Sequence, residues 1–540
     1  MTADAAAVPQ LVTSDFSTNT EPVIPAAFTQ IGRVIHHNNT PSFGQLGVLL
    51  EPDAEVKPGQ FLAVWHGRRN RHLLTILQVG DCREVNPNEE PQLSAARERL
   101  GLASSYAGEA TSTRIYRIAS CETMEEFEIE LAKEEWTLVG THAPEALSRS
   151  GDPVVLLPDA LSQAAIGSLD DPTKGINLGT AYGASSFPVT LVPNVLQMHI
   201  GVFGNPGKGK SYLSGIILEE AHAWDIPILA IDVNGELIEA ARALNGLVIT
   251  LPDAAKFGLS LNLLTPPELV SIAPNVQPNT NYAELIELAH DQLRNEARGK
   301  EITFEALKTR ISALGEKLET RASSIGAAIS RLSVLQRDPL IAVGRSFDFI
   351  ASLQKHKIVV LDCRYLSLRQ TQLIAAAAAR TLQRHGRQMT QRANEDGADE
   401  EAVRWLAVLF VDEAHAVAPN SESVISSQVL HELARMGRHV RTGLVLSSQS
   451  PADVDRSILK RLQTRFIFAI ERDQLAAIGG VAADLGNELL GQLPKLPRGV
   501  CAVSGTSELI KHGFLLNVKR RRTPVGGSTP PVFGGRTKST

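Results

Sequence analysis

The stretch that decides the fold is "GNPGKGKS", Gly204–Ser211, which lies between the apolar run "MHIGVFG" and the helix-like run "YLSGIILEEAHAW". Its glycines allow backbone N–H groups to converge on one point, and the N-terminus of the next helix adds partial positive charge. The GxxxxGK[ST] spacing therefore predicts a phosphate-binding loop, because the strand before it and the helix after it make a plain glycine-rich turn a poor alternative.

In such a loop Lys210 reaches the β- and γ-phosphates of ATP, and Ser211 offers its hydroxyl to Mg²⁺. We expect the nucleotide to contact Gly204, Asn205, Pro206, Gly207, Lys208, Gly209, Lys210, Ser211 and Tyr212.

Apolar runs alternate with helical segments through residues 190–518. The runs are "HIGVFG", "PILAIDVNG", "KIVVLDC", "WLAVLFVDEAH", "TGLVLSSQS" and "RFIFAI". Short buried runs separated by helices indicate a parallel sheet covered on both faces, which predicts a doubly wound α/β domain. Residues 280–340 are polar with helical periodicity, so we expect a helical insertion there.

The rest of the chain has a different pattern. Residues 28–160 contain short apolar runs with turn signals such as "EVKPGQ", which predicts a small β-barrel, with any other all-β module as the alternative. We expect residues 1–27 to be a flexible arm and residues 161–189 a linker. Residues 519–540 are rich in Pro, Gly, Ser and cations, so we expect a disordered basic tail.

Composition limits the function classes. The chain has 540 residues and a net charge of −6, which argues against a protein covered in positive charge for nucleic-acid binding, but not against a local basic surface inside a channel. No apolar run approaches the roughly 20 residues that cross a bilayer, and the start lacks the order of a signal peptide. We therefore expect a cytoplasmic protein with no membrane contact.

Acidic and amide side chains follow two of the predicted strands. Asp412 and Glu413 end "WLAVLFVDEAH", at the sheet edge where ligands bind in open α/β folds. Asp412 is suited to hold Mg²⁺ through water, and Glu413 to orient or deprotonate the attacking water. Gln449 ends "TGLVLSSQS", where an amide can sense the γ-phosphate; a hydrogen-bonded loop glutamine is the alternative.

Arginines recur at three-residue steps in "ELARMGRHVRTG", as Arg435, Arg438 and Arg441. On a helix this spacing forms one basic edge, from which an arginine can enter a neighbouring subunit's active site. Solvated surface arginines are the alternative, and the spacing does not show which subunit they face. Arg364 and Arg369 are further candidates, for contacts with DNA phosphates.

Taken together, these motifs resemble the HerA-like branch of the HerA/FtsK superfamily, hexameric DNA-translocating ATPases with an N-terminal barrel like that of ATP synthase subunits. The resemblance covers most of residues 28–518 and rests on "HIGVFGNPGKGKS", "PILAIDVNGEL", "LSLNLL", "VLFVDEAH", "ARMGRHVRTGLVLSSQSPADVD" and "LPRGVCAVSG". It implies a RecA-like P-loop ATPase domain that binds ATP and Mg²⁺, with Asp232 near the site. It also implies that Glu413 is catalytic, that Gln449 senses the γ-phosphate and that Arg438 is the arginine finger supplied in trans. Asn234 stands where the family pattern has histidine.

The resemblance also implies partners: a homo-hexameric ring, double-stranded DNA, and a nuclease or other effector protein, NurA-like or Sir2-like. The leading hypothesis is an ATP-dependent DNA translocase or helicase that serves such a partner in DNA end processing or antiviral defence. One alternative is an ATP-binding ring scaffold that assembles and regulates an effector enzyme. A third hypothesis is a motor for protein or a conjugative strand, which the lack of a membrane segment makes less favoured.

Overall fold

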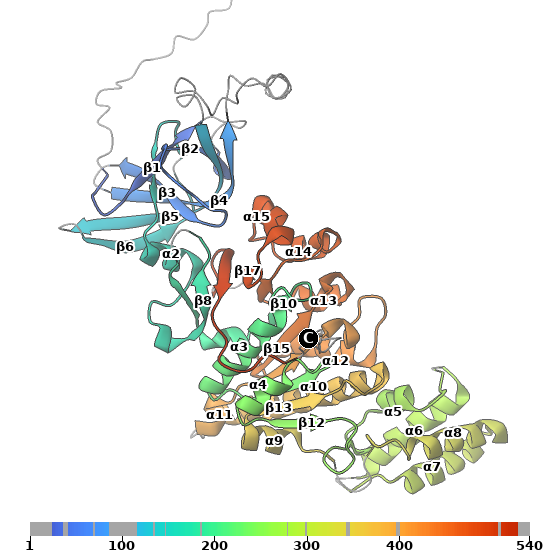
Figure 1. The fold of residues 1–540 in the computed structure, drawn as a ribbon. Coiled ribbons are helices and arrows are strands. Elements are labelled where there is room, and N and C mark those ends of the chain that lie inside the picture. The colour runs from blue at the N-terminus through green and yellow to red at the C-terminus, as the bar shows by residue number, and fades with distance from the viewer. Residues whose placement is uncertain are drawn as a thin grey trace, which may run out of the picture. The chain divides into compact units, whose positions relative to one another are not determined.

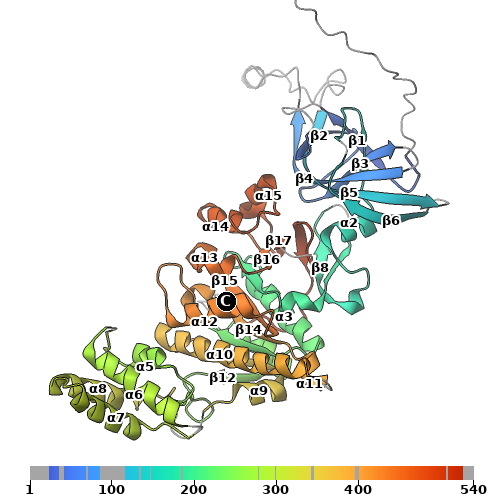
Figure 2. The same cartoon turned by 180° about the vertical axis from the view of Figure 1, so that it is seen from behind.

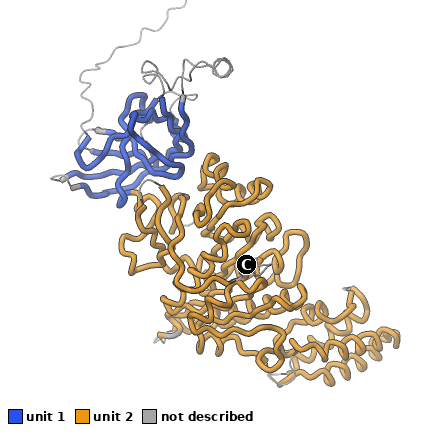
Figure 3. The backbone as a smooth tube through the Cα atoms, in the orientation of Figure 1, with its two compact units in different colours: residues 1–161 blue, residues 162–540 orange. Residues whose placement is uncertain are grey.

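The structure is a computed structural model, and it describes residues 24–526 except 36–41, 69–70, 86–115, 133–134, 146, 184–185, 278, 298–299, 342–345, 396–399 and 506–508. The chain divides into two compact units, residues 1–161 and residues 162–540 (Figure 3). Most of the expected arm, residues 1–27, lies outside the described residues.

The first unit is a closed β-barrel (Figure 1). Its strands pair in the order β2-β1-β7-β3-β4-β5-β6, and β2 also pairs with β5, which closes the ring and leaves β6 as an extension of β5. Inward residues alternate along the strands, as Leu46, Val48 and Leu50 do in β2. The strands are β1 (Gln30–Ile35), β2 (Gln45–Leu50), β3 (Phe61–Arg68), β4 (Arg71–Val85), β5 (Tyr116–Ala132), β6 (Glu135–His142) and β7 (Pro153–Leu156). The predicted N-terminal barrel is thereby confirmed.

The second unit contains an 11-stranded sheet in the order β12-β13-β11-β14-β15-β10-β16-β17-β18-β8-β9. The strands from β12 to β16 in this order are parallel, and those from β17 to β9 are antiparallel. Their bounds are β8 (Ile176–Ala181), β9 (Pro188–Leu191), β10 (Ile200–Phe203), β11 (Ile228–Asp232), β12 (Leu247–Thr250), β13 (Ile358–Asp362), β14 (Ala407–Val411), β15 (Thr442–Ser448), β16 (Thr464–Ile467), β17 (Val500–Gly505) and β18 (Phe514–Val518).

Helices cover both faces of this sheet (Figures 1 and 2). The crossovers β10-α3-β11 and β11-α4-β12 run toward one end of the strand order, whereas β13-α10-β14 and β14-α12-β15 run toward the other. Because parallel crossovers are right-handed, α3 and α4 lie on one face, and α10 and α12 on the other. The buried run Ala375–Ala379 belongs to α10, which contacts β11, β14 and β15. The α/β class is confirmed.

The helices of the sheet layers are α3 (Lys210–Ala223), α4 (Ile238–Ala243), α9 (Phe349–His356), α10 (Leu368–Ala393), α11 (Glu400–Arg404), α12 (Ile425–Met436), α13 (Arg456–Leu459), α14 (Leu475–Gly479) and α15 (Asn487–Gln492). A separate helical group packs together between β12 and β13 in sequence: α5 (Pro266–Ile272), α6 (Asn281–Ala297), α7 (Phe304–Lys317) and α8 (Ala322–Leu335). Arg380 of α10 forms an ion pair with Glu268 of α5 and so ties the group to the sheet layers.

Two segments differ from expectation. Residues 161–189 are not merely a linker, since they complete α2 (Asp159–Ile166) and supply β8 and the first residues of β9, with β8 paired to β18. The expected disordered tail is packed from Lys519 through Thr523, where the side chains of Arg521 and Thr523 are buried. Residues 527–540 lie outside the described part of the chain.

Candidate functional site: the phosphate loop and its carboxylates

The loop between β10 and α3 has the backbone of an anion-binding turn. Gly207 and Gly209 have φ of 76° and 131°, values that residues with side chains rarely adopt. A Cβ at Gly204 or Gly209 would lie 2.6 or 2.7 Å from atoms of the Phe468 side chain, so both positions need glycine. The loop leads directly into Lys210, the first residue of α3, which places the positive end of a helix at the site.

The remaining loop residues are fixed by backbone contacts. The Asn205 N–H donates to the Ala469 carbonyl at 2.9 Å, and the Lys208 carbonyl accepts from the Gly499 N–H at 2.9 Å. Pro206 is exposed, and Tyr212 accepts a hydrogen bond through its hydroxyl from the backbone N–H of Arg521 at 2.6 Å.

Lys210 is the centre of the site. Its ammonium group is buried and lies 3.2 Å from Asp412 Oδ1, 3.3 Å from Glu413 Oε1 and 3.1 Å from the Ser447 hydroxyl, with Glu236 Oε2 at 3.8 Å. Burial acts to lower the pKa of Lys210, but the surrounding carboxylates outweigh it and raise the pKa above its usual value. Lys210 therefore stays charged, with these carboxylates as its partners.

Ser211 and Glu236 meet beside Lys210. The Ser211 hydroxyl donates to Glu236 Oε2. Glu236 reaches this place because the buried carboxylate of Asp232 accepts the N–H groups of Gly235, Glu236 and Leu237 at 2.7, 3.1 and 2.9 Å and shapes the turn. Asp232 thus lies near the site as a residue that positions the turn.

Asp412 and Glu413 follow the buried strand β14. Burial raises the pKa of Asp412 to about 7, even though Lys210 acts to lower it. Asp412 Oδ2 is buried and has no hydrogen-bond partner in the described part of the chain. Glu413 has φ 50° and ψ 59°, a left-handed conformation that is costly for a residue with a Cβ and turns its side chain toward Lys210.

Three more side chains surround the Glu413 carboxylate. Oε1 accepts from Gln449 Nε2 at 2.6 Å and from Asn234 Nδ2 at 3.1 Å, and His415 Nδ1 lies 3.4 Å from Oε2. Burial acts to raise the pKa of Glu413, but the contacts with His415, Lys210 and Gln449 outweigh it and lower the pKa to about 2. Glu413 is therefore an ionised carboxylate at neutral pH.

The structure brings together Lys210, Ser211, Asp412, Glu413 and Gln449, which sequence patterns singled out one by one. It also adds Glu236, Ser447 and His415 to the group. Glu236 and His415 lie inside the segments "PILAIDVNGEL" and "WLAVLFVDEAH", so their closeness in sequence to a motif could have indicated that they belong to the site. Ser447 lies near the end of the strand that precedes Gln449, and no sequence pattern indicated a role for it.

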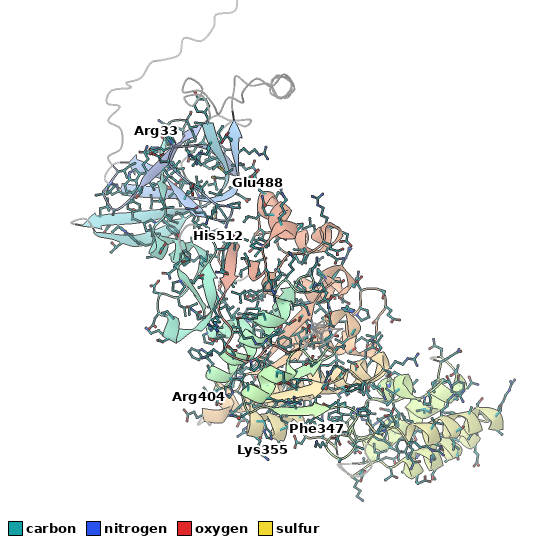
Figure 4. All side chains as sticks on the ribbon, viewed as in Figure 1. Arg33, Phe347, Lys355, Arg404, Glu488 and His512 are labelled. Carbon is teal, nitrogen blue, oxygen red and sulfur yellow. The ribbon has the colours of Figure 1, made fainter. Side chains whose placement is uncertain are left out.

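Arg438 lies elsewhere. It follows α12 and precedes β15, so it is at the amino edge of the parallel strands, the edge that Lys355 and Arg404 also mark because they precede β13 and β14 (Figure 4). Its side chain is exposed, and its carbonyl accepts a hydrogen bond from Gln197 Nε2 at 2.7 Å. The length of β15, about 20 Å at roughly 3.3 Å per residue, separates Arg438 from Gln449.

The other arginines are placed differently from one another. Arg441 donates to the carbonyl of Ala402 at 2.9 Å, whereas Arg435 is exposed. Arg364 is paired with Asp362 through Nε at 2.9 Å and Nη2 at 2.8 Å, so much of its donor capacity is used within the chain. Arg369 is exposed on the first turn of α10.

Residues 176–382 match the protein family described as "Helicase HerA, central domain". This match lies in the central part of the chain and confirms the resemblance seen in the motifs. The chain is 24% identical over 369 residues to the DNA double-strand break repair helicase HerA of Sulfolobus acidocaldarius, an alignment that covers 66% of this chain and 71% of the relative. It is 22% identical over 435 residues to the protein of the same name from Pyrococcus furiosus, with 72% and 76% covered.

Among solved structures, the chain is similar to VirB4 of Thermoanaerobacter pseudethanolicus, with a TM-score of 0.49, 17% identity, and 66% of this chain and 99% of that chain covered. It is also similar to the plasmid coupling protein TrwB in complex with ADP and Mg²⁺, with a TM-score of 0.45, 14% identity, and 63% and 89% covered. None of the helices in the described ranges is both long enough and apolar enough to cross a membrane.

Proposed function

We propose that this chain is a HerA-type ATPase that hydrolyses ATP with Mg²⁺ to move along double-stranded DNA as a ring. The observation that carries the proposal is the group around Lys210: two carboxylates and a hydroxyl within 3.3 Å of one buried ammonium, at the end of an anion-binding loop. A site that only bound nucleotide would not need a second carboxylate held beside the first.

The residues divide the work by their chemistry. Lys210 exchanges its carboxylate partners for the β- and γ-phosphates when nucleotide enters. The Ser211 hydroxyl and the unpartnered Asp412 Oδ2 are hard oxygen donors, which is the ligand type that Mg²⁺ prefers. Bound there, Mg²⁺ would neutralise charge that develops on the phosphates. These donors fit the ion.

Glu413 acts on the attacking water. Its carboxylate is ionised, and Asn234 and Gln449 fix Oε1 in place. When Lys210 leaves for the phosphates, Glu413 Oε1 loses one donor and becomes able to accept a proton or orient water. Gln449 contacts the same oxygen, so a change at the γ-phosphate is passed to β15.

The ring is supported by the position of Arg438. Its own phosphate loop is at the opposite edge of the sheet, so an exposed arginine at the amino edge is suited to a neighbouring subunit's site. We propose a homo-hexamer in which each site is completed in trans. The nuclease or effector partner, and a role in DNA end processing or antiviral defence, rest on the family resemblance; the names of the relatives support only the link to double-strand break repair.

The deciding experiment is ATP turnover measured with and without linear double-stranded DNA. The motor proposal expects DNA to stimulate turnover about tenfold or more, and it expects Glu413→Gln to abolish both rates. Turnover that DNA leaves unchanged, together with an ATP-dependent complex with an effector enzyme, would favour the ring scaffold instead.

A further inference from the structure

The C-terminal segment Lys519–Gly526, here called the C-terminal strap, packs along α3 (red end of the ribbon in Figure 1). Helix α3 is the helix whose first residues, Lys210 and Ser211, belong to the phosphate site. The strap begins where Lys519 forms an ion pair with Glu220 and runs toward the first turn of α3. Two distant parts of the sequence therefore share one helix.

Arg521 is the buried centre of the strap, with only 6% of its surface exposed. Its Nη1 donates to the carbonyl of Ser211 at 3.1 Å, Nη2 to the carbonyl of Pro524 at 2.6 Å, and Nε to the Thr523 hydroxyl at 2.8 Å. A planar guanidinium held in three directions is a fixed group, unlike a solvated surface arginine.

Helix α3 leaves space for this guanidinium at Gly215. A Cβ built at Gly215 would overlap the Cζ, Nε and Nη1 atoms of Arg521. Glycine within a helix is less favourable than alanine. Because position 215 has no side chain, the guanidinium group of Arg521 can lie against the backbone of α3.

Glu219 anchors the strap further along α3. Its side chain is 1% exposed, and it accepts from the Arg522 N–H at 2.9 Å, from the Thr523 N–H at 2.6 Å and from the Thr523 hydroxyl at 2.7 Å. A buried carboxylate requires such donors, so Glu219 and the strap need one another.

The strap also reaches the turn that carries Glu236. A Cβ at Gly526 would lie 2.9 Å from the Glu236 carbonyl and 3.1 Å from the Gly235 carbonyl. The Glu236 side chain accepts the hydroxyl hydrogen bond of Ser211. The strap therefore touches both the helix turn that carries Ser211 and the loop that faces it.

We infer that Arg521 is a positioning residue of the phosphate site, which holds the first turn of α3 through the Ser211 carbonyl. It does not touch the nucleotide. It fixes the direction of the Ser211 hydroxyl and adds positive charge near the helix N-terminus, where the phosphates and the metal ion are expected. This inference rests on the proposed function of the site.

The test uses full-length Arg521→Ala with Arg520→Ala as the matched control, because Arg520 is the adjacent arginine and is exposed. Loss of a fixed charged hydrogen bond predicts an increase of about tenfold in KM for ATP and in the half-saturating Mg²⁺ concentration. Arg520→Ala should match the wild type in both.

Gly215→Ala tests the same contact from the other side. The substitution favours the helix by propensity but displaces the Arg521 guanidinium, so KM for ATP should rise as in Arg521→Ala. In the double variant, the methyl group that Gly215→Ala introduces fills part of the space that Arg521 vacates. We expect the Tm of this double variant to approach that of the wild type while KM stays raised.

Each outcome of these measurements either supports the inference or contradicts it. Unchanged KM and Mg²⁺ dependence in Arg521→Ala, with only a lower Tm, would make the strap purely structural, as would a KM in the double variant that recovers with Tm. If the wild type and Arg520→Ala both fail to bind or hydrolyse ATP, the proposed function fails, and this inference with it. Wild-type turnover with an unaffected Arg521→Ala overturns this inference alone.

Discussion

The two edges of the parallel sheet carry opposite chemistry. At the carboxyl edge, Asp412, Glu413 and Glu236 surround the buried Lys210, so carboxylates outnumber the cation. At the amino edge, Arg438 is exposed and follows α12. On the function proposed above, the carboxyl edge binds nucleotide and metal, and Arg438 at the amino edge serves a neighbouring subunit. The length of β15 between the two edges is the reason why that proposal requires two chains.

The largest effect is expected at the carboxyl edge. Glu413→Gln keeps the shape of the side chain but removes the base, so turnover should fall about 10²–10⁴-fold while nucleotide binding remains. Lys210→Ala should lose nucleotide binding, because it removes the positive charge that compensates the phosphates for their lost contacts with water. Equilibrium binding of labelled ATP and single-turnover hydrolysis separate the two. Wild-type turnover in Glu413→Gln would show that the base is another group.

The next effect is expected at the amino edge. Arg438→Ala should bind ATP normally and hydrolyse it about 10²–10³-fold more slowly, as loss of a trans-acting arginine does. Mixing this variant with Lys210→Ala should restore part of the turnover, since some interfaces then combine an intact loop with an intact arginine. An Arg438 that acts within its own chain gives no recovery. Arg435→Ala, at an exposed arginine one helical step earlier, is the control.

Sequence patterns located the carboxyl edge well for a physical reason. The phosphate loop, Asp412 and Gln449 each follow a short apolar strand, and strand ends of a parallel sheet meet at one edge. Local spacing therefore predicted a group of side chains whose members are far apart in the chain. For Arg438, the family resemblance implied a role in a neighbouring subunit's site. The edge of the sheet on which Arg438 lies could not be predicted without the strand order, which only the structure gives.

The same reasoning failed where structure depends on pairing between distant segments. β8 lies in what was expected to be a linker, and its partner β18 follows more than three hundred residues later. The C-terminal strap is hydrophilic, so its burial through Arg521 and Glu219 has no apolar pattern to reveal it. Ion pairs and backbone hydrogen bonds hold it, and these leave no periodicity in sequence.

A smaller effect at the carboxyl edge is expected from Asn234, which stands where the family pattern has histidine. Asn234 Nδ2 donates to Glu413 Oε1, so Asn234→Ala should leave Glu413 ionised but less well fixed. One lost hydrogen bond to a charged group predicts a fall of about tenfold in kcat with KM for ATP nearly unchanged. Steady-state kinetics measures both. A change in KM alone would place Asn234 in nucleotide binding instead of in the orientation of Glu413.

The smallest expected effect is on how strongly stability depends on pH, and it comes from a histidine at the amino edge. His199 precedes β10, is buried, and accepts the Leu444 N–H through Nδ1 at 3.1 Å. Burial lowers the pKa of His199 to about 4, below its ordinary value of about 6.5 in an unfolded chain. The unfolded state therefore binds the proton more readily, and the stability that neutral His199 provides is complete above the unfolded pKa and declines as pH falls toward 4.

Between pH 7 and pH 6 this linkage predicts a loss of about 0.7 kcal/mol from the free energy of unfolding of the ATPase unit. His199→Asn tests it, because the Asn oxygen can accept the Leu444 N–H, does not titrate and tolerates the positive φ of 63° at this position. Thermal unfolding followed at both pH values should show a smaller decrease in Tm for His199→Asn than for the wild type. Equal decreases would mean that other groups cause the dependence of stability on pH.

His199 also lies close to the turn that carries Arg438, since a Cβ at Gly437 would lie 2.5 Å from His199 Cε1. A larger effect of pH on Arg438-dependent turnover than on nucleotide binding would link the protonation of His199 to the position of Arg438.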